Sequence, residues 1–310
     1  MSSFFTDDPM ALRGFDDLHA AADSAKPRVP VAVAGAADAT VLSALSQAHA
    51  RGWVEPILAG AAGEIRSTAA TAGVDIGPFK VVDAVDPASA AVAEVHSGRA
   101  RLLMKGQVDT PALMQAALDK SSGLRTASTV CQIVLMEIVD QNRRFLIADT
   151  GITIAPTLAQ KADILESLVA AARALGANCP RVALVAATEK VTTAMPDTLD
   201  SAELARRNAA GEFGGAVVEG PLSFDLAYSA DAGAKKRMVG EVVGAADALL
   251  FPNLIAANLA VKAMMYTARS RFGGVLCGLA APAAFMSRGD SAETRLNSLA
   301  LALPLVRFVR

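Results

Sequence analysis

The residue types best suited to chemistry lie near the end of the chain, in the segment SRGDSAE at residues 287–293. Arg288 carries a fixed fork of donors suited to phosphate, and the hydroxyl of Ser287 can stabilise a developing oxyanion. Asp290 and Glu293 add two carboxylates near the same anion site, at the start of a predicted helix. The alternative interpretation is a capping box, in which the carboxylates only stabilise the helix N-terminus, but capping does not require the Ser-Arg pair.

A second polar segment, KGQVDT at residues 105–110, follows a predicted strand and opens a helix. Lys105, Gly106 and Thr110 could hold an anion such as phosphate at the N-terminus of that helix. The simpler alternative, which the pattern alone favours, is a solvated turn with an ordinary helix cap. The GxxxxGK[ST] spacing of a P-loop is absent.

Two further groups of polar residues follow predicted strands. Asp149 could orient a substrate hydroxyl or amide, or it could tie down its own turn. Asn253 precedes a predicted helix, and within that helix Asn258 and Lys262 are four positions apart and so share one face. An Asn and a Lys aimed together at a cleft could bind a pyrophosphate or a carbonyl group; otherwise they form a solvated face.

The elements that must position these residues alternate along the chain. Short apolar runs predict strands at residues 29–34, 54–60, 79–82, 101–104, 145–149, 181–187, 215–219, 248–251, 274–277 and 283–286. Ala-rich segments predict helices at 10–22, 38–50, 62–72, 88–95, 157–175, 202–210, 235–246, 254–268 and 292–303. Such alternation indicates an α/β fold with mostly parallel sheets and helices on both faces. Ligands of such sheets bind beyond the carboxyl ends of the strands, where the polar segments lie.

Composition excludes several classes of protein. The 310 residues include 29 Lys and Arg against 31 Asp and Glu, which argues against a nucleic-acid binder with its basic stripe. The most apolar stretch, residues 249–265, is interrupted by Pro252 and by three polar side chains, so no membrane span is expected. Three isolated cysteines and three distant histidines indicate neither disulfides nor a metal site. With no signal-peptide pattern at the start, these features predict a cytoplasmic protein.

An ordered set of segments resembles one known family. The segments are LLMKGQVDTPALMQAAL, GLRT, PRVALVAATEKV, VEGPLSFDLA, FPNLIAANLAVKAMMY and SRGDSAETRLNSLALAL, which run from about Leu102 to Leu303. They are similar to segments of the phosphate acetyltransferase and phosphate butyryltransferase family, and the last one is closer to the butyryl branch.

The resemblance implies a fold, a reaction and partners. The fold would have two three-layer α/β/α domains, like isocitrate and isopropylmalate dehydrogenases, with the active site in the cleft between them. Domain I would comprise residues 1–145 plus 287–310, and domain II residues 146–286. The reaction would be reversible acyl transfer from a short-chain acyl-CoA to inorganic phosphate, by direct attack in a ternary complex. Coenzyme A would enter as substrate, with no further cofactor, and the protein would be a homodimer.

The resemblance also implies roles for the candidate residues. Ser287 and Arg288 match the pair associated with polarising the thioester carbonyl and binding phosphate. Three residues match the segment near the phosphate or CoA: Lys105, Gly106 and Thr110. Three others match the segment lining the cleft: Asn253, Asn258 and Lys262. Thr294 stands where the acetyl branch has a catalytic Asp, which leaves Asp290 and Glu293 as candidates for the general base.

Five positions depart from the family pattern: Gln115, Cys131, Gln132, Thr153 and Ile255. They leave an alternative open, in which the chain is a non-catalytic relative that binds CoA or a nucleotide in a regulatory or structural role. A dehydrogenase is less favoured, because neither a GxGxxG turn nor a paired-Asp metal site is present.

Overall fold

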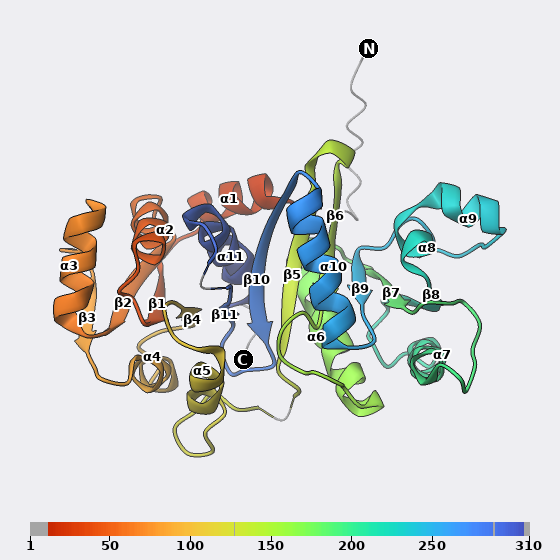
Figure 1. The fold of residues 1–310 in the computed structure, drawn as a ribbon, viewed down its shortest axis with the longest axis horizontal. Helices are drawn as coiled ribbons and strands as arrows, with labels where there is room; N and C mark the ends of the chain where they lie inside the picture. The colour runs from red at the N-terminus through yellow and green to blue at the C-terminus, as the bar shows by residue number, and fades with distance from the viewer. Residues whose placement is uncertain (1–11, 127, 288, 307–310) are drawn as a thin grey trace, which may run out of the picture.

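A single sheet runs through the whole molecule (Figure 1). The computed structural model describes residues 12–126, 128–287 and 289–306. Within them eleven strands form one sheet in the order β3-β2-β1-β4-β11-β10-β5-β6-β9-β7-β8. Their bounds are β1 Val29–Ala34, β2 Val54–Gly60, β3 Lys80–Asp83, β4 Leu102–Lys105, β5 Cys131–Ile138, β6 Arg143–Ala148, β7 Arg181–Val185, β8 Val217–Leu222, β9 Ala248–Leu250, β10 Ser270–Cys277 and β11 Ala283–Ala284.

The strand direction reverses in the middle of the sheet. Strands β3, β2, β1, β4 and β11 are parallel to one another, and so are β6, β9, β7 and β8. Between these two groups, β10 is antiparallel to both β11 and β5, and β5 is antiparallel to β6. The predicted α/β class with mostly parallel pairing is therefore confirmed, with one continuous sheet spanning both groups.

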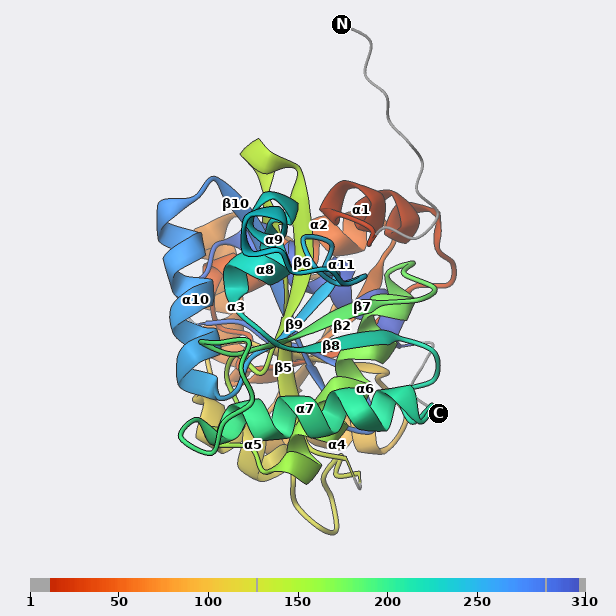
Figure 2. The same ribbon diagram turned by 90° about the vertical axis from the view of Figure 1, so that its right-hand side faces the viewer.

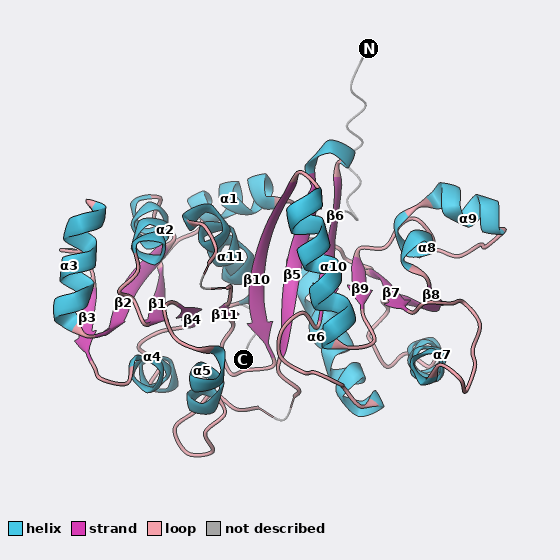
Figure 3. Cartoon of the chain, in the orientation of Figure 1, coloured by secondary structure: helices cyan, strands magenta, loops and turns pink. Residues whose placement is uncertain are grey.

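Helices cover both faces of the sheet. In Figure 3 the cyan helices lie above and below the row of magenta strands. Their bounds are α1 Phe15–Ser24, α2 Ala39–Ala50, α3 Ala62–Ala72, α4 Pro87–His96, α5 Thr110–Ala117, α6 Leu158–Ala174, α7 Pro196–Ala209, α8 Phe224–Tyr228, α9 Ala230–Lys236, α10 Leu254–Thr267 and α11 Ala292–Leu305. A short 3₁₀ turn, Val139–Gln141, joins β5 to β6.

Alternate residues of each strand point to opposite faces of the sheet and pack in two different apolar layers. In β1, Val31 and Val33 pack with α2 and α11, whereas Ala32 and Ala34 pack with α4 and α5. In the other half of the sheet, α6 and α10 lie on opposite faces, as the turned view shows (Figure 2). This period of two follows from the pleat of a β-strand and produces three layers throughout.

Two local predictions need correction. The helix predicted over residues 235–246 is wrong, because α9 ends at Lys236 and Arg237 adopts a left-handed φ of 56°. Strand β5 was not expected, although its eight residues are almost all apolar and buried. Of the helix predicted over 10–22, residues 10 and 11 lie outside the described part of the chain, and α1 begins at Phe15.

The last helix returns to the first part of the chain, where α11 packs against α2, α1 and β10. Strands β10 and β11 pair with β5 and β4. The proposed domain boundaries at residues 145 and 287 stay a prediction. Among the helices that the structure describes, none combines the length and the apolar character needed to cross a membrane.

Candidate active site

A cavity of about 480 Å³ lies near the reversal of strand direction. Its walls come from the end of β4, the start of α5, β5, the loop after β6, one face of α10, β10 and the segment after β11. Six of the predicted site residues line it together: Lys105, Thr110, Asn258, Lys262, Ser287 and Asp290. The segments that the sequence singled out separately therefore meet around one space.

Lys105 is the cation that the fold encloses most completely in this cavity. It is the last residue of β4, and only 3% of its surface is exposed. Its Nζ lies 5.8 Å from the ring centroid of Phe285, within cation–π range. Lys262 of α10 lines the same cavity from the opposite side and is exposed. These two lysines can bind an anion within a cavity that the carboxylates of Asp109 and Asp290 also line.

Asp290 is a carboxylate whose environment suits a general base. One of its oxygens accepts a hydrogen bond from the backbone N–H of Ser287 at 2.6 Å. Burial raises the pKa of Asp290 above its ordinary value, while that hydrogen bond and the charges of Arg295, Lys262 and Lys105 act in the opposite direction. A carboxylate with a raised pKa is a stronger base than an ordinary aspartate.

The other two candidates of this segment are placed differently. Glu293 is exposed on the first turn of α11 and is not among the residues that line the cavity. Arg288 lies outside the described residues, so its predicted contact with phosphate stays a prediction. Of the two candidate bases, the geometry favours Asp290.

Gly106 contributes backbone geometry. Its N–H donates to the carbonyl of Ala34 at 2.8 Å, and a Cβ at this position would overlap the carbonyl oxygen of Gly35. We expect Gly106→Ala to lower the free energy of unfolding by about 1–3 kcal/mol, because the loop after β4 must move away from β1. Gly289→Ala is the matched control, because a Cβ there meets nothing within 4 Å. Urea denaturation of both variants measures the difference; equal stability would contradict the close approach.

Of the three residues predicted on or next to α10, Asn258 and Lys262 line the cavity and Asn253 does not. Asn258 lines the cavity, and its Nδ2 donates to the carbonyl of Thr150 at 2.9 Å, which fixes the loop after β6 against the helix. Asn253 caps α10, since its Oδ1 accepts from the N–H of Ala256 at 3.0 Å, and it is not part of the cavity wall. The structure thus assigns Asn253 a capping contact.

Asp149 is buried behind the cavity wall, with only 3% of its surface exposed. Its carboxylate accepts hydrogen bonds from the backbone N–H groups of Gln132, Gly151, Ile152 and Thr153 at 2.7 to 3.2 Å. Burial raises the pKa of Asp149, and these N–H groups act against that shift. Of the two predicted alternatives, the structure supports the one in which Asp149 ties down its own turn.

Comparison with known proteins decides the family. A family model described as Phosphate acetyl/butaryl transferase matches residues 83–303. The chain belongs to this family. Phosphate butyryltransferase from Clostridium acetobutylicum is 38% identical over 275 residues, which cover 88% of this chain and 91% of that protein. Phosphate acetyltransferase from Thermotoga maritima is 36% identical over 274 residues, covering 88% and 93%.

Solved structures agree with this assignment. A branched-chain phosphotransacylase from Enterococcus faecalis superposes with a TM-score of 0.78 at 28% identity, covering 90% of this chain and 99% of that one. A putative 4-hydroxythreonine-4-phosphate dehydrogenase from Salmonella typhimurium shares the fold alone, with a TM-score of 0.59 at 13% identity over 90% of this chain and all (100%) of that one. The family resemblance noted in the sequence implies such a dehydrogenase-like fold.

The departures from the family pattern can now be located. Gln132 lines the cavity, and its Nε2 donates to the carbonyl of Phe285 at 3.2 Å, whereas Gln115 is exposed away from it. The hydroxyl of Thr153 donates to the carbonyl of Val130. Cys131 and Ile255 also lie outside the cavity wall, the first buried and the second exposed.

Cys131 is unsuited to nucleophilic attack. The residue is fully buried at the start of β5, and burial raises the pKa of its thiol well above the ordinary value. Because the thiolate is the reactive form, this cysteine stays unreactive near neutral pH. Cys131 is a small residue of the apolar core.

One side of the cavity is apolar, and sequence reasoning did not single it out. Its wall comprises Val134, Val261, Met265, Phe272, Phe285 and Met286. These residues lie in strands, at strand ends and in a helix, and their apolar side chains are typical of a protein core in the sequence. These side chains give an apolar surface to the cavity that Lys105 and Lys262 also line.

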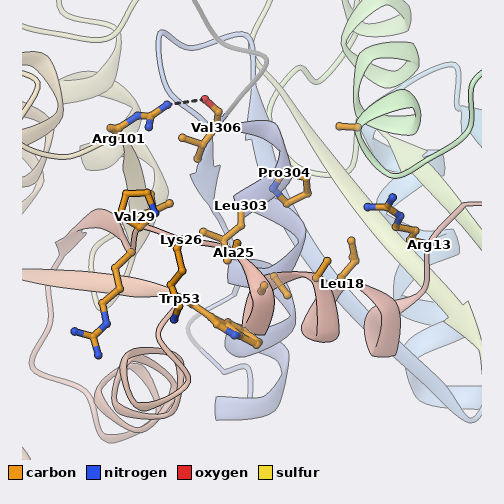
Figure 4. Close-up of a pocket in the computed structure, with 16 residues that line it drawn as sticks. Arg13, Leu18, Ala25, Lys26, Val29, Trp53, Arg101, Leu303, Pro304 and Val306 are labelled. Carbon is orange, nitrogen blue, oxygen red and sulfur yellow. Dashed lines mark hydrogen bonds between the residues drawn. The ribbon is translucent and has the colours of Figure 1, made fainter.

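A second cavity, of about 250 Å³, lies between α1 and α11 (Figure 4). Its wall includes Leu18, Trp53 and Leu303, together with the basic residues Arg13 and Lys26. None of the predicted site residues lines it. The 480 Å³ cavity is therefore the candidate active site.

Proposed function

We propose that the protein transfers a short acyl group reversibly between coenzyme A and inorganic phosphate. One observation carries this proposal: a single cavity joins two lysines, a carboxylate with a raised pKa, a serine hydroxyl and an apolar wall. Phosphate needs the cations, the acyl chain needs the apolar wall, and the CoA thiol needs a base. The family to which the chain belongs supports the same reaction.

In the direction of acyl phosphate synthesis, an oxygen of phosphate attacks the thioester carbonyl directly. Lys105 and Lys262 hold the phosphate, and the hydroxyl of Ser287 donates to the oxyanion that develops on the carbonyl oxygen. Ionised Asp290 accepts the proton of hydrogen phosphate as the phosphate oxygen attacks, the C–S bond then breaks, and Asp290 passes that proton to the leaving thiolate. In reverse, ionised Asp290 accepts the proton of the CoA thiol, whose pKa of about 8.5 needs only modest assistance near neutral pH.

Thiol release tests the proposal. Acetyl-CoA, propionyl-CoA and butyryl-CoA are supplied in turn, with and without phosphate, and free thiol is followed. We expect release that depends on phosphate with at least one of them. CoA binding without thiol release from any of the three would favour the alternative, a non-catalytic relative with a regulatory or structural role.

We further propose that the protein acts in the cytoplasm as a homodimer that pairs through α10. Ile255, Leu259 and Tyr266 are exposed by 62%, 62% and 84%, and their spacing places them along one face of the helix. Tyr266 also belongs to the cavity wall, so a subunit packed on this stripe would lie next to the active site.

Leu259→Asp is expected to convert the dimer to a monomer, because a buried unpaired carboxylate is costly at an apolar interface. Sedimentation velocity measures the change. Val239→Asp serves as the matched control, since Val239 is exposed by 98% in a loop away from α10. A Leu259→Asp variant with the mass of the wild type would exclude this interface.

A further inference from the structure

Arg295 is a buried arginine that touches three segments, two of which belong to the wall of the candidate active site. It lies on α11, and only 1% of its surface is exposed. Its Nε donates to the hydroxyl of Thr40 at 2.9 Å, while Nη1 and Nη2 approach the carbonyls of Lys105 and Ser287, each at 3.4 Å. One guanidinium therefore joins the start of α2, the end of β4 and the loop after β11.

A second set of hydrogen bonds ties the same segments from the side of α2. Asp38 caps α2, and its carboxylate accepts from the N–H of Val41 at 2.9 Å and from the hydroxyl of Thr40 at 2.6 Å. Its other oxygen accepts from Nε2 of Gln107 at 2.8 Å, in the loop after β4. The loop that follows Lys105 is thus held at two points, through Asp38 and through Arg295.

The charge of Arg295 also acts on the candidate base. Three cations face Asp290 from three elements: Arg295 from α11, Lys262 from α10 and Lys105 from β4. Asp38 faces Arg295 from α2. Each cation favours the ionised form of Asp290 against the effect of burial.

The fold itself does not require a charge at this position. Burying a guanidinium costs free energy, and well-packed apolar side chains often serve stability equally well. What an apolar side chain lacks is a planar fork able to reach two carbonyls at once, and lysine lacks this fork as well. The two carbonyls that Arg295 reaches belong to two residues of the cavity wall.

We propose that Arg295 is a positioning residue: it fixes the loop after β4 relative to the loop after β11 and keeps Asp290 in its carboxylate form. The proposal rests on the proposed function for its kinetic consequence. Arg295 does not line the cavity, so it acts through Lys105, Ser287 and Asp290.

Three variants separate the effect of Arg295 on the two loops from its effect on the charge of Asp290. Arg295→Met keeps the volume and removes both fork and charge; we expect kcat/KM to fall about tenfold or more and the acid limb of its pH profile to move to higher pH. Arg295→Lys keeps the charge, so its kcat/KM should fall while the acid limb stays in place. Thr40→Val removes the hydrogen bond from Arg295 and the one to Asp38 but leaves the approach of the guanidinium to both carbonyls, and we expect a smaller loss with an unmoved limb.

Arg181→Met is the matched control. Arg181 is a partly buried arginine that pairs with both oxygens of Asp247 at the start of β7, away from the cavity. Its replacement should lower the unfolding temperature but leave the acid limb and KM for phosphate unchanged. If Arg295→Met behaves in the same way as this control, Arg295 is merely structural and the proposal is overturned.

A measurement independent of activity keeps the proposal separate from the proposed function. The ¹³C carboxyl signal of Asp290, assigned by its absence in Asp290→Asn, is titrated in the wild type and in Arg295→Met. We expect a higher pKa in the variant; an unchanged titration refutes the effect on Asp290 even if no transfer is detected. Should Arg295→Met not fold, wild-type kcat/KM in both Arg295→Lys and Thr40→Val would overturn the positioning role.

Discussion

Replacing Asp290 by asparagine is expected to lower kcat for phosphate-dependent thiol release by about 10²- to 10⁴-fold, the usual contribution of a positioned general acid–base. The amide keeps the size of the side chain and can still accept from the N–H of Ser287, so the loop should hold its shape. What is lost is the group that exchanges a proton with the CoA thiol. Stopped-flow or steady-state measurement of thiol release gives the ratio directly.

The pH dependence of wild-type activity tests whether Asp290 acts as a base. Asp290 works as a base only when ionised, and its pKa is raised by burial. Activity should therefore fall as the pH drops through a value above the ordinary aspartate range, and this acid limb should be absent from the residual activity of Asp290→Asn. Glu293→Gln is the companion variant: a large loss there with a mild one in Asp290→Asn would transfer the role to Glu293.

Lys105→Met should raise KM for phosphate about 10- to 100-fold, which corresponds to the loss of one hydrogen bond to a charged group. Lys105 is the buried cation of the cavity, and methionine keeps most of its volume beside Phe285. Because the loss concerns the anion, KM for the acyl-CoA should stay close to that of the wild type. Initial rates over a grid of both substrate concentrations separate the two constants.

Lys161→Met is the matched control for this experiment. Lys161 is also a buried lysine, but it pairs with Asp197 and Asp200 between α6 and α7, outside the cavity. Its loss should affect stability and leave KM for phosphate unchanged. A rise in KM for acyl-CoA alone in Lys105→Met would place Lys105 against CoA instead of the transferred phosphate.

The position of the site could be predicted from the sequence because one rule covers most of it. Lys105 follows one strand and Ser287 another, and the ligand of an open α/β sheet binds where such strands end. The same rule also selected Asp149 and Asn253. Their side chains satisfy backbone N–H groups nearby, and a strand-end position alone cannot separate these local contacts from contacts with a ligand.

Arg295 could not be recognised in the sequence. An arginine on an amphipathic helix normally lies on the solvated face. It is buried here because α11 packs against α2 and β10, and the packing partners of a helix are decided by the whole topology. The missed strand β5 and the helix wrongly predicted over residues 235–246 are local errors. In the second case Arg237 adopts a left-handed conformation and α9 ends at Lys236.

The place of β11 in the sheet has a consequence for synthesis of the protein. β11 fills the position between β4 and β10, and Arg295 bonds to a carbonyl 190 residues earlier in the chain. While the ribosome is still translating, β4 therefore has one unpaired edge, which is a template for wrong pairing with other chains. The cavity wall is incomplete until Ser287 and Asp290 have been synthesised, and nascent chains that stop before residue 283 carry an open edge that chaperones would have to cover.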